Sequence, residues 1–243
     1  MDTEPVTRPV THPATRRVAL ITGASQGRGF ELADALAGRG WRLVIDARRR
    51  DRLDAAAAAL SERTDVTAIE GDVADADHRA EIAKTVRALG RLDLLVNNAS
   101  TLGTSPLPTL DSIELDVFRR IYEVNVVAPL ALVQELLPLL VECRGAIVNI
   151  TSDAAVEPYA EWGGYGSSKA ALEQLSAILA EEHPDVRVWA VDPGDMRTEM
   201  HRDAFPGEDI SDRPHPETVV PRLVALIESE QPSGRHRLAE VTS

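Results

Sequence analysis

The sequence predicts an α/β domain built on one doubly wound parallel sheet of about seven strands, with helices on both faces in three αβα layers. Short, nearly continuous apolar runs alternate with segments of helical periodicity, which is typical of strands buried on both faces. A helix separates each strand from the next, so the crossovers are expected to be right-handed. The length of 243 residues suits a single large domain.

The elements follow one another in a regular order after the first 16 residues. The apolar runs predict strands at 18–22, 41–47, 66–70, 92–96, 146–151, 186–191 and 236–239. The helical periodicity predicts helices at 30–38, 53–62, 76–89, 115–141, 165–182 and 217–229. Residues 1–16 are rich in Pro and Thr and predict a flexible leader, without the apolar stretch of a signal peptide. Residues 17–243 are expected to form the domain, and the irregular stretch 193–216 a functional lid.

Composition excludes several classes of protein. A formal net charge of −13 argues against a general nucleic-acid or anionic-membrane binder. The one cysteine, Cys143, leaves no internal disulfide and no cysteine-rich zinc site, and it suits a reducing cytoplasm. The apolar run 126–141 is interrupted by two prolines, Gln134 and Glu135, so it is expected not to span a bilayer. We therefore expect a soluble, cytoplasmic protein without a metal.

A glycine-rich loop follows the first strand and opens the first helix. Its sequence runs from Thr22 to Gly29 with glycines at 23, 27 and 29. Glycines there allow a tight turn and a close approach of the backbone to a pyrophosphate, while the helix N-terminus offers free N–H groups. The alternative is a glycine-rich turn without a ligand, because short glycine patterns also occur by chance.

A tyrosine and a lysine lie four residues apart at the start of a predicted helix. Positions i and i+4 share one helix face, so Tyr165 and Lys169 can point into one site. Only two of the 26 basic residues are lysines, Lys84 and Lys169, so the spacing has a low probability of arising by chance. A free tyrosine has a pKa near 10, and a nearby cation favours its ionised form. The pair therefore predicts a proton-transfer group.

These motifs together resemble the short-chain dehydrogenase/reductase family over roughly residues 17–238. The family's adenine-contacting pair is similar to Asp72-Val73, its fourth-strand motif to Asn97-Asn98-Ala99, and its nicotinamide segment to Pro193-Gly194 with Thr198. The resemblance implies a Rossmann-type fold and an NAD(P) cofactor. It implies cofactor contacts from Gly23, Ser25, Gln26, Gly27, Arg28, Gly29, Arg48, Asp72, Val73, Asn98, Ala99, Tyr165, Lys169, Pro193, Gly194 and Thr198.

The resemblance also implies a catalytic set of four residues. Tyr165 would be the general acid/base, Lys169 would tune it, Ser152 would polarise the carbonyl and Asn125 would hold a water relay. Taken singly, Ser152 could be a strand-end turn residue and Asn125 a polar group at a helix bend. Their order and spacing favour the catalytic interpretation.

Two residues depart from the family pattern. Ser100 stands where the family usually has Gly, and this small side chain is expected to be tolerated. Arg28 stands where a small apolar residue is usual. It could lie over the cofactor phosphates, or it could extend into solvent.

The choice between NAD and NADP depends on the residues that end the second strand. An acid about 20 residues past the glycines selects the ribose hydroxyl of NAD, and an Arg nearby accommodates the 2′-phosphate of NADP. The family register places Ala47 at the position of the acid and Arg48 at that of the NADP-selecting Arg. A shift of one residue would instead make Asp46 the NAD-selecting acid. We favour NADPH, since a guanidinium suits a phosphate better than a hydroxyl.

The sequence therefore predicts an NADPH-dependent reductase of a small-molecule carbonyl, or the reverse dehydrogenase. The alternatives are a non-catalytic nucleotide-binding regulatory protein of the same fold and an isomerase or dehydratase with the same site.

The helices 115–141 and 165–182 resemble the family's contact helices, so a homodimer or homotetramer is expected, and a monomer in analytical ultracentrifugation would refute it. His78 is expected at the surface and His201 in the lid, and five further side chains could line a substrate pocket or simply pack the lid: Trp162, Tyr159, Met196, Met200 and Phe205.

Overall fold

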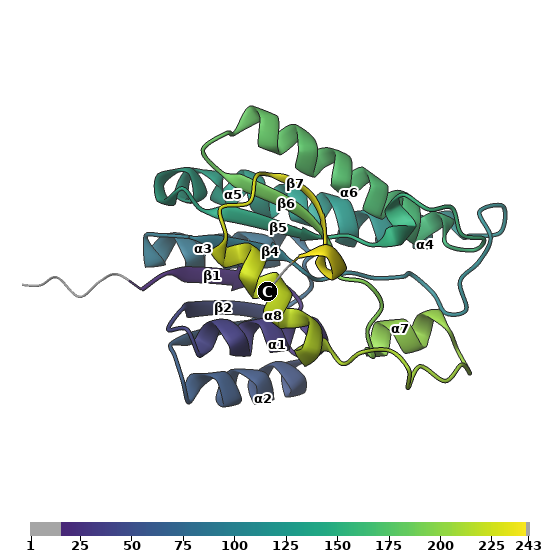
Figure 1. The fold of residues 1–243 in the computed structure, drawn as a ribbon, viewed down its shortest axis with the longest axis horizontal. Helices are drawn as coiled ribbons and strands as arrows, with labels where there is room; N and C mark the ends of the chain where they lie inside the picture. The colour runs from purple at the N-terminus through teal and green to yellow at the C-terminus, as the bar shows by residue number, and fades with distance from the viewer. Residues whose placement is uncertain (1–15, 242–243) are drawn as a thin grey trace, which may run out of the picture.

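A computed structural model describes residues 16–241, so the predicted leader, apart from Arg16, lies outside the described residues. Within this range seven strands form one fully parallel sheet in the order β3-β2-β1-β4-β5-β6-β7 (Figure 1). The strands are β1 (Val18–Ile21), β2 (Arg42–Ala47), β3 (Val66–Glu70), β4 (Leu94–Asn97), β5 (Ala146–Ile150), β6 (Arg187–Asp192) and β7 (Gly234–Arg237). The predicted doubly wound sheet is confirmed, and the chain order reverses between β1 and β4.

Helices cover both faces of this sheet, as Figure 1 shows. One face carries α1 (Gly27–Ala37), α2 (Arg50–Ser61) and α8 (Pro216–Glu228). The other carries α3 (Ala76–Leu89), α5 (Ala128–Cys143) and α6 (Gly163–Glu182). Two short helices, α4 (Leu115–Tyr122) and α7 (Glu199–Ala204), lie at the edge beyond the carboxyl ends of the strands. The predicted αβα layers are confirmed.

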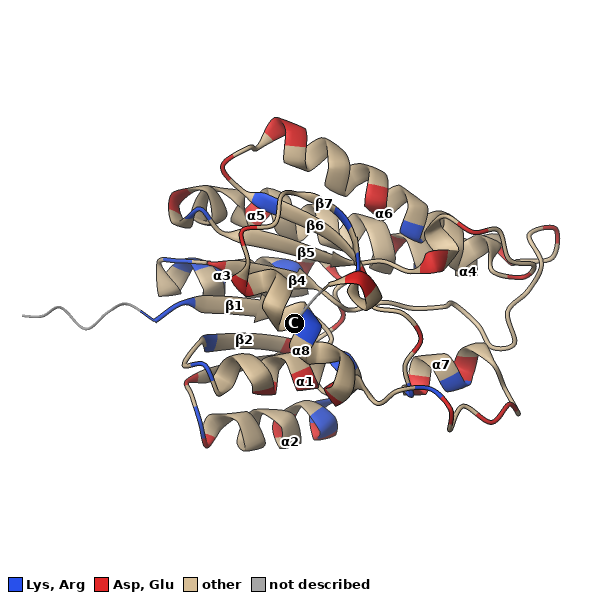
Figure 2. Ribbon diagram, in the orientation of Figure 1, with Lys and Arg blue, Asp and Glu red and all other residues tan. Residues whose placement is uncertain are grey.

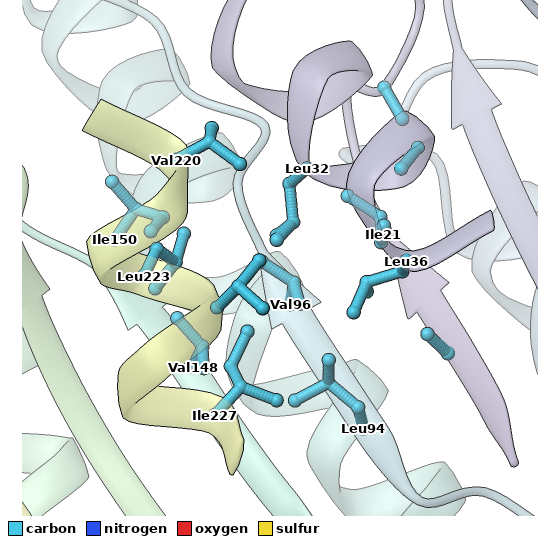
Figure 3. Close-up of a cluster of buried hydrophobic side chains, with 14 of the residues drawn as sticks. Ile21, Leu32, Leu36, Leu94, Val96, Val148, Ile150, Val220, Leu223 and Ile227 are labelled. Carbon is cyan, nitrogen blue, oxygen red and sulfur yellow. The ribbon is translucent and has the colours of Figure 1, made fainter. Parts of the chain in front are cut away.

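The apolar runs of the strands divide between two cores because successive side chains of a strand point to opposite faces. In β1, Ala19 and Ile21 pack on the side of α1 and α8, whereas Val18 and Leu20 pack on the side of α3 and α5. Figure 3 shows the first core, where side chains of α8 meet those of the central strands. The labelled residues there include Val96, Val148, Ile150, Val220, Leu223 and Ile227.

The predicted long helix 115–141 is interrupted. Between α4 and α5 the chain makes a π-helical turn, Glu123–Val127, with Asn125 fully buried in it. Such turns are rare and occur often at functional sites. The predicted lid 193–216 likewise contains a helix, α7, whose first turn is capped by Thr198, because its Oγ1 accepts a hydrogen bond of 3.2 Å from the His201 N–H. The expectation of an entirely irregular lid was wrong in this respect.

Figure 2 shows charged residues mainly on helices and loops, with the central strands almost free of them. One stretch, Leu115–Cys143, is long and apolar enough to cross a membrane by length and composition. Its most apolar 18 residues have a mean hydropathy of 1.9, and 44% of them are buried inside the domain. Because a core helix of this kind passes the same test, the stretch is weak support for a membrane span.

Candidate active site

A cavity of about 390 Å³ opens at the carboxyl edge of the sheet, where the chain order reverses. This is the place where open parallel sheets bind their ligands. Twelve of the predicted cofactor residues line it: Gly23, Ser25, Gln26, Gly27, Arg28, Gly29, Arg48, Asp72, Val73, Asn98, Ala99 and Thr198. The predicted contacts Tyr165, Lys169, Pro193 and Gly194 do not line this cavity.

The glycine loop is shaped to bring backbone close to a ligand. Gly23 has φ +65°, and a Cβ there would lie 3.0 Å from the Ala99 Cα, so a larger residue would push two walls of the cavity apart. Asn98 fixes the loop from the end of β4, since its Nδ2 donates to the Thr22 carbonyl at 2.8 Å and to the Gly23 carbonyl at 3.1 Å. The N-terminus of α1 follows without a side-chain cap. Free N–H groups and the positive end of the helix dipole fit a dinucleotide pyrophosphate.

Asp46 is part of the scaffold beneath this loop. Its side chain is 1% exposed, Oδ1 accepts a hydrogen bond of 2.9 Å from the Gly23 N–H, and Oδ2 lies 3.0 Å from His78 Nε2. Burial raises the pKa of this carboxyl, while the hydrogen bonds from His78 and Gly23 oppose the rise. Both oxygens are engaged by protein groups, so Asp46 offers neither to a ribose. The expectation that His78 is a surface residue was wrong, because its side chain is buried and hydrogen-bonded to Asp46.

The end of β2 brings both Asp46 and Arg48 to the cavity wall, and of the two only Arg48 is exposed. Arg48 is exposed and lines the cavity together with Arg49 and Arg52. Across the cavity, Asp72 is paired with Arg120 of α4, and Asp72 Oδ1 also accepts a hydrogen bond of 3.0 Å from the Ala74 N–H. The predicted adenine-contacting residues therefore sit in a charged wall of the cavity.

Tyr165 and Lys169 lie one turn apart on α6 and are both buried, at 9% and 2% exposure. Lys169 Nζ donates to the Ile150 carbonyl at 2.8 Å and lies 5.4 Å from the centre of the Tyr165 ring. The first turn of α6 can approach the end of β5 because residue 166 is a glycine. A Cβ at Gly166 would lie 2.6 Å from the Ala154 carbonyl oxygen. The spacing on α6 thus brings the predicted pair together, and the glycine lets α6 pack closely on the residues that follow β5.

Burial is the largest cause of the pKa shifts of Tyr165 and Lys169. It raises the pKa of Tyr165 to about 12, and it lowers the pKa of Lys169 to about 7, with a smaller contribution from Arg28. The cation that most opposes the rise at Tyr165 is Arg28, followed by a hydrogen bond to Ser100. The sequence argument had assigned this tuning role to Lys169. A lysine with a pKa near 7 can gain and lose a proton at neutral pH, which suits a proton relay.

Arg28 turns into the site instead of into solvent. Its Nε donates to Asn98 Oδ1 at 3.1 Å, and its charge interacts with Tyr165 and Asp192. Burial lowers the pKa of Arg28 to about 10. The departure from the family pattern therefore brings a cation to the phenol, an arrangement that the sequence argument did not consider.

Ser100, the second departure, links two of the predicted catalytic residues. Its Oγ donates to Asn125 Oδ1 at 3.1 Å, and a hydrogen bond also joins it to the Tyr165 phenol. Asn125 is further held by Thr101, whose N–H lies 2.9 Å from Oδ1, and by Ser168, whose Oγ accepts from Nδ2 at 3.0 Å. The role of Ser100 was missed, since only the size of its side chain had been considered.

Ser152 is the predicted catalytic residue that the structure does not bring onto the phenol. Its Oγ donates to Asp153 Oδ1 at 2.8 Å and accepts from the Ala154 N–H at 3.2 Å. The residue therefore caps the short 3-10 turn Asp153–Ala155 after β5. Among the hydrogen bonds of the described residues none joins Ser152 to Tyr165.

Trp162 packs on Tyr165 and links it to aromatic side chains of the predicted lid 193–216. Trp162 contacts the Tyr165 ring at 5.8 Å and Phe205 at 5.6 Å between centroids, and Phe205 contacts His201 at 4.9 Å. Met200 also packs in this cluster, whereas Met196 belongs to the core beneath α1 and α8. Pro193 and Gly194 begin the lid, where the Gly194 N–H donates to Asp192 Oδ1 at 3.0 Å.

Comparisons with known proteins agree with this geometry. Residues 17–209 match the short chain dehydrogenase family. The human protein "Dehydrogenase/reductase SDR family member 2, mitochondrial" is 37% identical over 192 residues, which cover 76% of this chain and 67% of that protein. Serine 3-dehydrogenase of Agrobacterium fabrum is 35% identical over 184 residues, covering 74% of this chain and 72% of that enzyme.

Solved structures are also similar to this chain in fold. An alcohol dehydrogenase from the archaeon Thermococcus sibiricus, complexed with 5-hydroxy-NADP, superposes with a TM-score of 0.83 and 28% identity over 91% of this chain and 95% of that one. The fold and the site define the class of protein, an oxidoreductase that acts on small-molecule substrates with NAD(P)(H). Within this class, the chain belongs to the short-chain dehydrogenase/reductase family.

Proposed function

We propose that the protein interconverts a carbonyl and an alcohol of a small molecule with NADP(H) as cofactor. The observation that carries the proposal is the buried Tyr165–Lys169 pair beside a glycine-walled cavity whose β2 end presents Arg48. When bound, NADPH supplies the hydride that reduces the carbonyl carbon. The protein supplies the proton, positions the substrate and excludes water.

The proton transfer is assigned to Tyr165 and to the groups around it. Tyr165 donates its phenolic proton to the carbonyl oxygen, and its pKa of about 12 in the free protein keeps it protonated beforehand. Lys169, with a pKa of about 7, replaces that proton through the water relay that Asn125 is proposed to hold. Arg28 and Ser100 stabilise the phenolate that is left. Ser152 is proposed to polarise the carbonyl, which requires its hydroxyl to leave Asp153 when substrate enters.

The positions of Arg48 and Asp46, the two residues that could select the cofactor, support the preference for NADP(H). Arg48 is exposed at the cavity, where a guanidinium can bind a 2′-phosphate, whereas both oxygens of Asp46 are engaged below the loop. Related structures support the same cofactor, since those from Thermococcus sibiricus and Shigella flexneri are described as complexes with 5-hydroxy-NADP and NADP.

A fluorescence titration with NADPH and NADH tests the proposal. We expect tighter binding of NADPH, and Arg48→Ala is expected to weaken NADPH by about 10- to 150-fold while leaving NADH unchanged, because a charge-assisted hydrogen bond contributes about 1.5–3 kcal/mol. A preference for NADH would contradict the NADP assignment. Binding without turnover of any carbonyl or alcohol in a screen would favour the regulatory alternative, and products with unchanged redox state would favour an isomerase or dehydratase.

We also propose a cytoplasmic homodimer or homotetramer. Support comes from apolar side chains exposed on the outer helices, Val127 and Val141 at α5 and Ile178 on α6. Exposed apolar side chains on neighbouring helices are typical of contact surfaces between subunits. Sedimentation of a monomer at micromolar concentration would contradict the proposal.

A further inference from the structure

Two polar side chains from different walls of the cavity converge on one carboxylate oxygen. Gln26 Nε2 donates to Glu199 Oε2 at 2.7 Å, and Arg52 Nη1 donates to the same oxygen at 2.5 Å. Arg52 also contacts the Gln26 side-chain oxygen. Gln26 and Arg52, called here the anion clasp, therefore hold an anion between them.

The clasp lies beside Arg48, the residue assigned above to the 2′-phosphate. Gln26 directly precedes α1, and Arg52 lies in the first turn of α2, which follows β2 and Arg48. All three line the same cavity as Arg49 and Glu199. Convergent amide and guanidinium donors are the groups that bind a phosphate oxygen.

Glu199 reaches this place from the lid. It is the first residue of α7 and lies 147 residues from Arg52 in the chain, so their contact joins the lid to the wall of the cavity. The hydrogen bonds from Arg52 and Gln26 hold the pKa of the Glu199 carboxyl below its usual value. The carboxylate is therefore charged at neutral pH, and it would repel a phosphate brought to the same donors.

We propose that Glu199 is an internal competitor for the cofactor's 2′-phosphate. In the free protein its carboxylate occupies the clasp, and the 2′-phosphate of NADP(H) displaces it on binding. NAD(H), which has a hydroxyl at that position, leaves the contact intact. Glu199 thus weakens the binding of NADP(H) selectively and sets how strongly the protein discriminates between the two cofactors. This inference rests on the proposed NADP(H) function.

The expected effect is modest because the pair is partly exposed. Side-chain exposure is 32% for Arg52 and 46% for Glu199, so solvent screens their attraction. Removing the competing charge should tighten the binding of a 2′-phosphate by about two- to five-fold at low salt, and by less at high salt.

The test compares two lid variants of the full chain by isothermal titration calorimetry. Glu199→Gln removes the carboxylate from the clasp, and Glu208→Gln is the matched control because it removes the same charge from an exposed lid position outside the cavity. The probes are 2′,5′-ADP and 5′-AMP, which differ only in the 2′-phosphate. Thermal melting checks that both variants remain folded.

We expect Glu199→Gln to bind 2′,5′-ADP more tightly than wild type, with 5′-AMP unchanged and Glu208→Gln equal to wild type for both probes. Weaker binding of 2′,5′-ADP, no change, or an equal gain for both probes would overturn the role of Glu199. The proposed cofactor preference is judged separately, from the ratio of the two probes in wild type. If wild type shows no preference and Glu199→Gln acquires one, the competition is supported even though the wild-type preference is not.

Discussion

His78 on α3 is joined to Gly23 in the nucleotide loop through the single carboxylate of Asp46. His78 Nε2 lies 3.0 Å from one oxygen of Asp46, and the Gly23 N–H lies 2.9 Å from the other. A helix packed on one face of the sheet therefore supports the loop on which the cofactor is expected to rest. Asp46, which could have selected NAD by binding its ribose, is therefore assigned a structural role.

Replacing this carboxylate should affect both cofactors alike. Asp46→Ala leaves the Gly23 N–H and the His78 ring without their partner, and we expect a loss of about 1–3 kcal/mol in the free energy of unfolding. The binding of NADPH and NADH should weaken by the same factor. Chemical denaturation and nucleotide titration measure the two effects, with the exposed Asp51→Ala as control. A selective loss of NADH binding would mean that Asp46 touches the ribose.

The Tyr165 phenol is expected to carry the proton transfer. Tyr165→Phe keeps the ring that packs on Trp162 but removes the hydroxyl, so turnover should fall by about 10²- to 10⁴-fold. Nucleotide affinity should stay within about two-fold, because the ring packing is kept. Tyr122→Phe is the matched control, since Tyr122 lies at the end of α4 and its ring packs on Phe118. Wild-type turnover in Tyr165→Phe would remove the residue from the mechanism.

Ser100 should shift the pH dependence of the reaction. Its hydrogen bond lowers the pKa of Tyr165, so Ser100→Ala should raise that pKa. In the alcohol-oxidising direction, where the phenolate is the base, the rising limb of the kcat/KM profile should move to higher pH by about one unit. Ser112→Ala, at an exposed serine bonded to Thr109, should leave the profile in place. An unmoved limb in Ser100→Ala would limit Ser100 to holding Asn125.

Lys169 should make stability depend on pH. Its pKa is about 7 in the folded protein and about 10.5 for an unperturbed lysine, so between these values the unfolded chain binds more protons and stability rises with pH. Relative to Lys169→Met, the wild type should therefore lose stability as pH falls from about 10 to about 7, by an amount on the order of a few kcal/mol. Thermal melts of both proteins across this range test it, and parallel curves would contradict the low pKa.

The sequence was sufficient for the order of elements and for twelve of the residues that line the cavity. Apolar runs and helical periodicity located the seven strands to within about two residues, because the five inner strands are buried on both faces and leave a clear pattern. The π-helical turn at Asn125 could not be seen, since it depends on contacts with Thr101 and Ser168. Helix α7 was missed because six residues are too few for a periodic pattern.

The direction in which side chains point was the second feature that could not be predicted from the sequence. The inward turn of Arg28 depends on Asn98, and the role of Ser100 depends on the placement of Tyr165. The burial of His78 depends on Asp46, which is 32 residues away in the chain. Each partner comes from a different element, so only the tertiary arrangement determines which way these side chains point.

The burial of Lys169 has a practical consequence for covalent labelling. The chain has two lysines. Lys84 is exposed on α3, whereas Lys169, on α6, has a buried side chain. An amine-directed reagent should therefore attach a dye or a solid support to the side chain of Lys84 and spare that of Lys169. The attachment point lies on a helix outside the cavity, so immobilised protein should keep its nucleotide site open to solution.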